Sequence, residues 1–171
     1  MAQEQQRPIG SDAAGYELIR EAVRFLLNSY PGLETGEKVK YDALGKESGL
    51  IFTDTGGALV YTEVFDIVGN VRQTCSYPFY VVYRSTATEE RTKLNIQRFL
   101  DNFGAWITGE PVELNGKIEQ LTAYPILIGA RRIEEIKRDN SYGTEPQENG
   151  VQDWVLPVTV RYSNKTRRLF A

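Results

Sequence analysis

The feature that most constrains the fold is a stretch near the C-terminus in which large apolar side chains alternate with smaller or more polar ones. The large residues are Trp154, Leu156, Val158, Val160 and Tyr162. Because successive side chains of a β-strand point to opposite faces of the sheet, these residues share one face. The pattern predicts a strand with one face in the core and a second, wetter face.

Two segments carry the apolar period of an amphipathic helix. The first begins after Ser11 or Asp12, either of which could cap it, and ends at Pro31. The second follows Thr86 and Glu89, whose spacing matches a capping box. Such apolar faces predict helices that pack on a sheet. The two faces are formed by Tyr16, Ile19, Ala22, Val23, Phe25, Leu26 and Leu27, and by Leu94, Ile96, Phe99, Leu100, Phe103, Trp106 and Ile107.

A β-hairpin is predicted between the two helices. Residues 58–68 and 71–84 are rich in β-branched and aromatic side chains, and Gly69-Asn70 supplies a turn between them. Pro78 cannot donate a ladder hydrogen bond, so it marks an edge position, a bulge or a bend. The order of helix, hairpin, helix and strands predicts an α+β fold, in which an antiparallel β-sheet carries both main helices on one face.

The remaining segments are less regular. Residues 33–57 contain repeated glycines and charges and are interpreted as an elaborated loop, in which 39–41 and 50–52 are the plausible short strands. After the second helix we expect a strand at about 118–128, a charged stretch at 131–138 that is a solvated ribbon or an interface edge, and a polar loop at 139–150.

The length predicts a single domain, because a chain of 171 residues can bury roughly two-thirds of the surface that its unfolded form exposes. Residues 1–11 are predicted to be a flexible N-terminal arm, residues 12–162 the α+β domain, and residues 163–171 an extended C-terminal arm. The C-terminal arm is basic and ends with Leu169-Phe170-Ala171, so it is expected either to dock on a neighbouring chain or to be disordered.

Composition removes several classes of function. The chain has no histidine, the commonest general base and metal ligand, and its single cysteine, Cys75, excludes an internal disulfide and a thiolate zinc cluster. A net charge of −3 argues against a dominant basic surface for nucleic acid. There is no signal-peptide pattern and no apolar run of the ~20 residues that span a bilayer. We therefore expect synthesis in a reducing cytoplasm and no membrane partner.

The acidic groups that could do chemistry are Glu89-Glu90, Glu134-Glu135 and the loop set Asp42, Glu47 and Asp54. Neighbouring carboxylates could coordinate magnesium or calcium, or act as an acid and a base. The first pair instead fits a helix start, the second alternates with basic residues, and the loop set does not match an EF-hand. No glycine-rich phosphate-binding motif is present. We expect a protein without enzymatic activity, cofactor or metal.

An aromatic group near residue 80 has two interpretations. Exposed aromatic side chains on a sheet can stack on nucleic-acid bases, but the basic neighbours here are few. We favour a core face and a second face at a sheet edge or subunit contact. The aromatic group is Tyr77, Phe79, Tyr80 and Tyr83; by alternation, the first face comprises Phe79, Val81 and Tyr83, and the second comprises Tyr80, Val82 and Arg84.

The order of these pieces resembles the minor capsid or tail-terminator proteins that are encoded by long-tailed bacteriophages (siphophages) and prophages. The resemblance runs from about residue 13 to residue 162 and includes no catalytic motif. It is carried by the opening helix, the tract 39–45 leading to 48–50, the aromatic strand 77–84, the helix with Asn95-Ile96, Phe99, Phe103 and Trp106-Ile107, and the closing strand 154–162. The loop 139–150 and the C-terminal arm are longer than the family pattern.

The resemblance implies a tail-terminator-like fold and a homohexameric ring at the head-proximal end of the tail tube. Such a ring would stop tube polymerisation and present a surface to the head-completion or stopper protein. Its partners would be its own copies, the tail tube protein and the stopper, while phage DNA would pass through the lumen without specific binding. The protein would be assembled in the host cytoplasm and found in the virion, at the neck of the tail.

Three alternatives stay open. The chain could be another neck component, such as a stopper or connector adaptor, or a subunit like that of the tail tube. Outside the virion, it could be a small ligand-binding domain. In the ring interpretation, contacts come from the loops and the C-terminal arm. The residues predicted to make them are Tyr41, Leu50, Phe52, Tyr80, Arg84, Lys165, Arg167, Arg168, Leu169 and Phe170.

Overall fold

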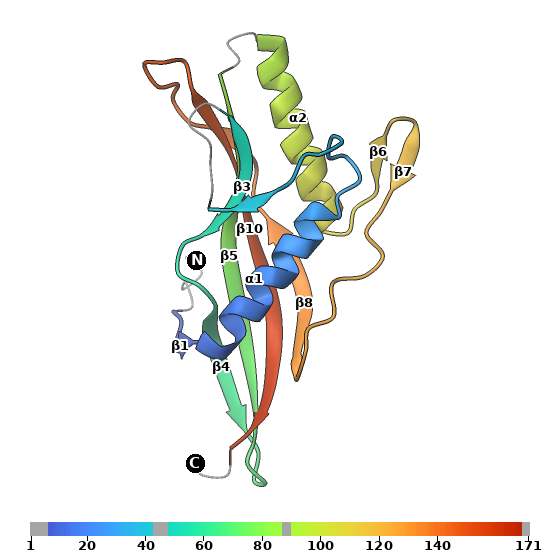
Figure 1. Cartoon of the computed structure of the whole chain (residues 1–171). Coiled ribbons are helices and arrows are strands. Elements are labelled where there is room, and N and C mark those ends of the chain that lie inside the picture. The colour runs from blue at the N-terminus through green and yellow to red at the C-terminus, as the bar shows by residue number, and fades with distance from the viewer. Residues whose placement is uncertain (1–6, 43–47, 87–89, 169–171) are drawn as a thin grey trace, which may run out of the picture.

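The computed structural model describes residues 7–42, 48–86 and 90–168, which form two helices and a mainly antiparallel sheet (Figure 1). The helices are α1 (Ala13–Asn28) and α2 (Glu90–Ile107). The sheet contains β1 (Gly10–Ser11), β2 (Lys40–Tyr41), β3 (Gly49–Asp54), β4 (Leu59–Phe65), β5 (Asn70–Ser85), β8 (Arg131–Arg138), β9 (Tyr142–Gly143) and β10 (Gln152–Arg167). A separate two-stranded sheet pairs β6 (Val112–Leu114) with β7 (Lys117–Glu119).

Two long strands form the spine of the sheet. β5 and β10 pair antiparallel along their whole length, from Ser85 opposite Gln152 to Asn70 opposite Arg167. On its other side β5 pairs first with β4 and then with β3, while β10 pairs with β8 and β9. The parallel pair of β2 with β3 is short. The predicted α+β class, with an antiparallel sheet, is therefore confirmed.

Pro78 lies at a local edge of the sheet, one of the positions predicted for it. β4 pairs with β5 up to Ser76, and β3 pairs with β5 from Phe79 onward, so Pro78 falls in the gap between them. Pro157 of β10 lies in a similar gap, between the stretches paired with β9 and β8. Proline has no backbone N–H to donate to a neighbouring strand. A long strand can therefore contain a proline at a gap, where there is no neighbouring strand on one side to accept that hydrogen bond.

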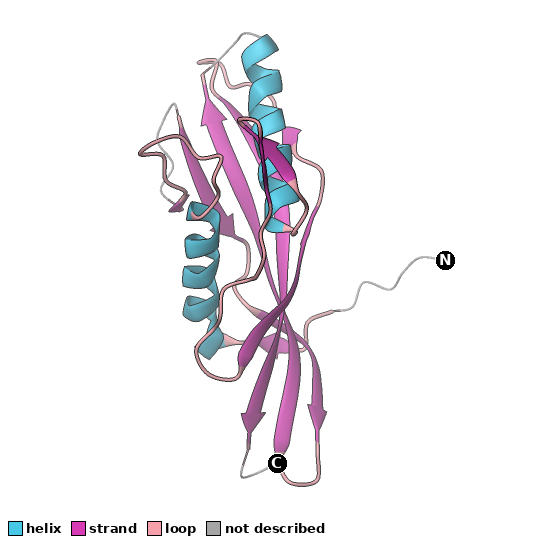
Figure 2. Ribbon diagram, turned by 90° about the vertical axis from the view of Figure 1, so that its right-hand side faces the viewer, coloured by secondary structure: helices cyan, strands magenta, loops and turns pink. Residues whose placement is uncertain are grey.

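One hydrophobic core joins both helices to the same face of the sheet. The alternating residues of β10, from Trp154 to Tyr162, are all buried in it, as predicted. The second helix contributes Phe103 and Trp106, which are also buried as predicted. Because the residues of the opposite sheet face, such as Ile51, form a separate small cluster, both helices cover one face. Figure 2 shows this arrangement and the strong twist of the sheet.

Two predicted core residues of the helices are instead on the surface. Phe25 of α1 is 69% exposed and Leu94 of α2 is 56% exposed. The core side of α1 is narrower than its apolar sequence pattern, because Ile19, Val23 and Leu26 already fill the space above the sheet. The predicted capping box of the second helix lies partly outside the described residues.

The predicted domain boundaries at both ends need correction. β10 does not end at Tyr162, because residues 163–167 continue to pair with residues 70–74 of β5. At the other end, Gly10 and Ser11 pair with β4. The apolar alternation stops where the helices stop covering the sheet, but the backbone ladder needs no apolar side chains to continue. The part of β4, β5 and β10 beyond the helices, residues 62–65, 70–74 and 163–167, is called here the sheet extension (Figure 2).

A second correction concerns the segment after α2. The predicted strand at 118–128 is wrong beyond β7, since residues 120–130 form no regular strand. The charged stretch 131–138, expected at the surface or at an interface edge, is strand β8 with Ile133 and Ile136 in the core. These two isoleucines are three residues apart, and a bulge in the pairing with β10 brings both to the inner face.

The paired end of β10 gives a stability prediction. Deleting residues 163–171 should lower the free energy of unfolding by about 2 kcal/mol or more, because it removes several ladder hydrogen bonds and the buried Asn164. Deleting only residues 169–171 should leave it unchanged within about 0.5 kcal/mol. Urea denaturation measures both truncations. Equal stability of the two would contradict the pairing of residues 163–167.

Candidate interaction surfaces

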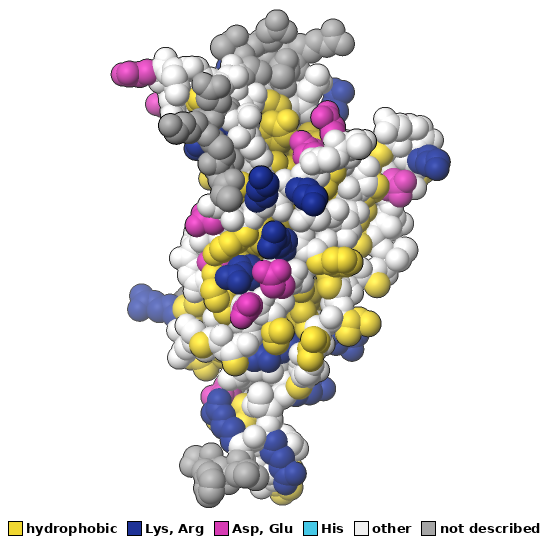
Figure 3. Space-filling view, in the orientation of Figure 1, with side chains coloured by type: hydrophobic (Ala, Val, Ile, Leu, Met, Phe, Trp, Pro, Cys, Tyr) yellow, Lys and Arg dark blue, Asp and Glu magenta, His cyan; other side chains and the backbone are white. Residues whose placement is uncertain are grey.

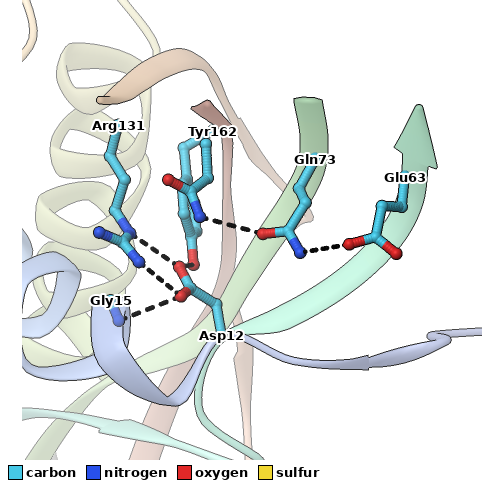
Figure 4. Close-up of polar contacts among 7 residues, drawn as sticks. Asp12, Gly15, Glu63, Gln73, Arg131 and Tyr162 are labelled. Carbon is cyan, nitrogen blue, oxygen red and sulfur yellow. Dashed lines mark hydrogen bonds and ion pairs between the residues drawn. The ribbon is translucent and has the colours of Figure 1, made fainter. Parts of the chain in front are cut away.

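A buried carboxylate fixes the start of α1 to the far edge of the sheet (Figure 4). Asp12 caps the helix by accepting from Gly15 N–H, at 3.1 Å. The Arg131 guanidinium of β8 donates to both Asp12 oxygens, at 2.9 and 2.7 Å, and the Tyr162 hydroxyl of β10 donates at 2.8 Å. Burial alone would raise the pKa of Asp12, but these hydrogen bonds outweigh it and hold the pKa below its usual value.

The sheet extension is held by a row of polar side chains that crosses its three strands on the helix side. Asn164 of β10 donates to Gln73 of β5 at 3.0 Å, and Gln73 donates to Glu63 of β4 at 3.0 Å, the second bond being visible in Figure 4. Arg168 then donates to Glu63 at 2.6 Å and lies over the ring of Phe65. The extension is thus cross-linked by hydrogen bonds where no helix covers it.

A second polar cluster joins α1 to β2, β3 and β5. Three tyrosine hydroxyls, of Tyr16, Tyr41 and Tyr77, donate to one oxygen of Asp54, at 2.7, 3.0 and 2.9 Å respectively. Burial is the first cause that raises the pKa of Tyr16 and Tyr77; the next is the hydrogen bond with Tyr41 for Tyr16 and the bond to Asp54 for Tyr77. With three donors on one Asp54 oxygen, the cluster holds α1, β2, β3 and β5 in place.

The hairpin tip, residues 64–70, comprises the end of β4, the turn and the start of β5, and its turn is fixed by hydrogen bonds. Asp66 accepts from the backbone of Val68 and Asn70, both at 2.9 Å, and from the Asn70 side chain at 2.7 Å. Gly69 has a φ of +87°, and a Cβ there would meet the Arg168 carbonyl oxygen, so only glycine fits this turn. On this frame the exposed apolar side chains are Val64, Phe65, Ile67 and Val68, of which Ile67 is fully exposed.

The outer face of the sheet extension, away from the helices, is basic. Arg72 of β5 lies directly opposite Lys165 of β10, and Arg167 is the next outward residue of β10. All three side chains are exposed, and all three line a hollow beside the hairpin tip. Like charges placed directly opposite each other on a sheet oppose its folding. This part of the surface is therefore suited to an acidic partner.

A groove runs along α1 beside its core residues, and it is called here the helix groove. One wall is α1, with Leu18 and Phe25, and the other is the irregular segment 125–128. Figure 3 shows apolar side chains gathered on this face of the molecule. The groove is lined by Ala14, Glu17, Leu18, Glu21, Ala22, Phe25, Pro125, Ile126, Leu127 and Ile128.

The predicted contact residues of the first long loop are mostly internal. Leu50 and Phe52 are 6% and 0% exposed and belong to the core, so their prediction as contact residues is corrected. The short strand predicted at residues 50–52 is confirmed as part of β3, but it pairs with the central strand β5, so its side chains enter the core and do not face a partner. Tyr41 is half-buried, packs on Phe52 and donates to Asp54, so it serves the polar cluster described above.

The other predicted contact residues are divided between the two ends of β10. Tyr80 lies on the outer face beside Ile51, and Arg84 donates to both oxygens of Asp153 at 2.7 and 2.9 Å. At the other end, Lys165 and Arg167 lie on the basic face of the sheet extension and Arg168 is bonded to Glu63. These residues are strand-bound rather than on a free arm. Leu169 and Phe170 lie outside the described residues.

Sequence reasoning missed the hairpin tip and the helix groove. Ile67 and Val68 were placed in a strand arm because they are β-branched, although Asp66 and Gly69 are the turn residues of the sequence. In the groove, Ala14, Leu18, Ala22 and Phe25 recur at helical spacing beside the core stripe. This second apolar stripe on α1 was the feature of the sequence that could have indicated the groove.

No protein-family model matches the chain, and no curated protein matches it significantly. Within residues 7–42, 48–86 and 90–168, no group of three or more His, Cys, Asp or Glu side chains could hold a metal ion. In the same part of the chain, no helix is long and apolar enough to cross a membrane. Function is therefore argued from the surfaces themselves.

The single thiol gives a prediction that tests the core around β5. Cys75 is 1% exposed, and burial raises its pKa to about 11. Because the thiolate is the reactive form, the folded protein should not react with a thiol reagent at pH 8 over an hour, whereas the protein in guanidinium should react completely. Rapid reaction of the native protein would show that Cys75 is accessible.

Proposed function

We propose that this chain is a structural protein of a long-tailed phage and forms a closed ring at the head-proximal end of the tail tube, as a tail terminator. The observation that carries the proposal is the presence of two different exposed apolar surfaces, the hairpin tip and the helix groove, on one α+β domain. Exposed apolar patches mark interaction sites. Two unlike patches on identical subunits suit the heterologous contacts that close a ring.

The resemblance noted in the sequence supplies the rest of the proposal. The partners would be further copies of the chain, the tail tube protein and the stopper of the head, with phage DNA in the lumen. The chemistry of the described residues agrees with such a passive role. Both oxygens of Asp12 and one oxygen of Asp54 accept hydrogen bonds from the protein itself, and these clusters position secondary structure.

A tube-assembly experiment tests the proposed role. Purified protein is added to polymerising tail-tube protein encoded beside it, and the products are imaged by negative stain. We expect rings at one end of the tubes and a shorter length distribution. Copolymerisation along the tube would instead indicate a tube-like subunit, and unaltered tubes without bound rings would contradict the proposal.

A further inference from the structure

We propose that the hairpin tip of one copy inserts into the helix groove of a second copy, so that Ile67 and Val68 pack between α1 and residues 125–128. This inference rests on the proposed function, because it supplies the heterologous contact from which the ring is built. The occupant of the groove is thus another molecule of the same chain.

The tip is shaped to enter a groove without reorganising. Its turn is fixed by the hydrogen bonds of Asp66, and Arg168 N–H donates to the Gly69 carbonyl at 2.9 Å, which ties the turn to the end of β10. Ile67 and Val68 are 104% and 60% exposed, so most of their apolar surface is available to a partner. A rigid apolar projection loses little conformational entropy when it binds.

The groove is equally preformed. Leu127 is buried in the core, which anchors the second wall and leaves its neighbours Ile126 and Ile128 pointing outward, at 98% and 80% exposure. A few residues further on, Arg131 is held by Asp12 at the start of α1. The two walls of the groove are therefore fastened to each other, and the apolar floor between them stays open.

Charge complementarity selects a second copy as the occupant. The groove is lined by Glu17 and Glu21 and by no basic residue. Glu21 is already paired with Arg20 at 3.7 Å and with Arg24 at 4.0 Å, whereas Glu17 has no ion-pair partner among the described residues and is the carboxylate open to a partner. The hollow beside the tip is lined by Arg72, Lys165 and Arg167, with Asp66 as its acidic member. Opposite charges on the two surfaces would steer the encounter and fix its register.

The geometry makes the contact intermolecular. The hairpin tip lies at the far end of the sheet, below the start of α1 in Figure 1, and points away from the molecule. The groove is lined by α1 itself and by residues 125–128. One copy cannot place its tip in its own groove without unpairing β4, β5 and β10. A tip that meets the groove of the next copy leaves the second copy's own tip free, so the contact propagates from subunit to subunit.

Cysteine pairs test the contact directly, since the native Cys75 is buried. The variants are Val68→Cys at the tip, Ile128→Cys in the groove, and Ile118→Cys as a control of similar exposure on β7. Under a mild oxidant, we expect disulfide-linked dimers when Val68→Cys is mixed with Ile128→Cys, and at least about tenfold less product from either alone or with Ile118→Cys. Peptide mass spectrometry identifies the linked residues.

Charge reversal gives an independent readout. Glu17→Lys in the copy that carries Ile128→Cys should lower the yield of the mixed disulfide about tenfold. A tenfold change corresponds to a loss of about 1.4 kcal/mol of binding free energy. The matched control is Glu135→Lys, an acidic residue of β8 outside the groove, which should leave the yield unchanged.

The contrary outcomes are distinct. Strong dimer formation by Val68→Cys alone would indicate a tip-to-tip contact and overturn the inference. A closed oligomer in sedimentation without the mixed disulfide would overturn it while leaving the proposed ring in place. Flotation with phosphatidylserine vesicles that depends on Ile67, without the mixed disulfide, would assign the tip to a membrane surface. A monomer under all conditions would contradict both the inference and the proposed function.

Discussion

Replacing Asp12 by alanine is expected to lower the free energy of unfolding by about 3–5 kcal/mol, the usual cost of leaving a buried charge without its partner. The Arg131 side chain, 13% exposed, would lose both of its hydrogen bonds to Asp12. The Tyr162 hydroxyl would lose its acceptor in the core, and α1 would lose its cap. Because Asp12 joins α1 to β8 and β10, its replacement removes contacts of all three elements at once.

Urea denaturation at pH 7 measures this effect. The matched control is Glu135→Ala, because Glu135 also pairs with basic side chains, Lys137 and Arg161, but at the exposed surface. Exposed ion pairs contribute about 0–1 kcal/mol, so the control should be nearly neutral. If both variants lose the same small amount of stability, the Asp12 network does not have the role described here.

The same network predicts a pH dependence. The folded-state pKa of Asp12 is below its usual value, so the stability it contributes is present above its unfolded-state pKa of about 3.9 and is lost as the pH falls through the folded-state pKa. The difference in stability between the wild type and Asp12→Asn should therefore be constant above about pH 5 and shrink below pH 4. A difference that grows on acidification would contradict this sign.

Replacing Phe103 by alanine should also cost about 3–5 kcal/mol, the range for truncating a fully buried phenylalanine. Phe103 is 0% exposed, and its ring lies 4.7 Å from that of Tyr30 and 5.9 Å from that of Phe99. Leu94→Ala on the same helix is the control, since Leu94 is exposed and should cost less than about 0.5 kcal/mol. Thermal unfolding that left both variants unchanged would place this face of α2 outside the core.

The sequence was most informative where side-chain period and burial agree. The alternation of β10 and the apolar face around Phe103 both describe surfaces that meet one core, so they predicted the α+β fold. The side-chain period did not predict the buried residues of β8, because the bulge changes which residues face inward. A bulge leaves no mark in the hydrophobicity pattern of the sequence. The period failed again at residues 163–167, where pairing continues beyond the last apolar position.

The candidate surfaces were harder to predict for a related reason. An apolar residue in a sequence is expected to be buried, and Phe25, Ile67 and Ile126 were assigned on that basis to a helix face or a strand. In the structure they lie at the surface, Phe25 on the outer side of α1, Ile67 in the turn of the hairpin and Ile126 in the irregular segment before β8. Three-dimensional packing is needed to separate an apolar residue that builds the fold from one that is left for a partner.

The subunit number of the purified full-length protein tests the central claim most directly. Sedimentation velocity or native mass spectrometry over a range of concentrations should give one closed assembly of fixed size, which the resemblance predicts to be a hexamer. Closed heterologous contacts end at a definite number, whereas unclosed ones give a series of growing oligomers. A monomer at every concentration, or an open-ended series without a preferred size, would contradict the account.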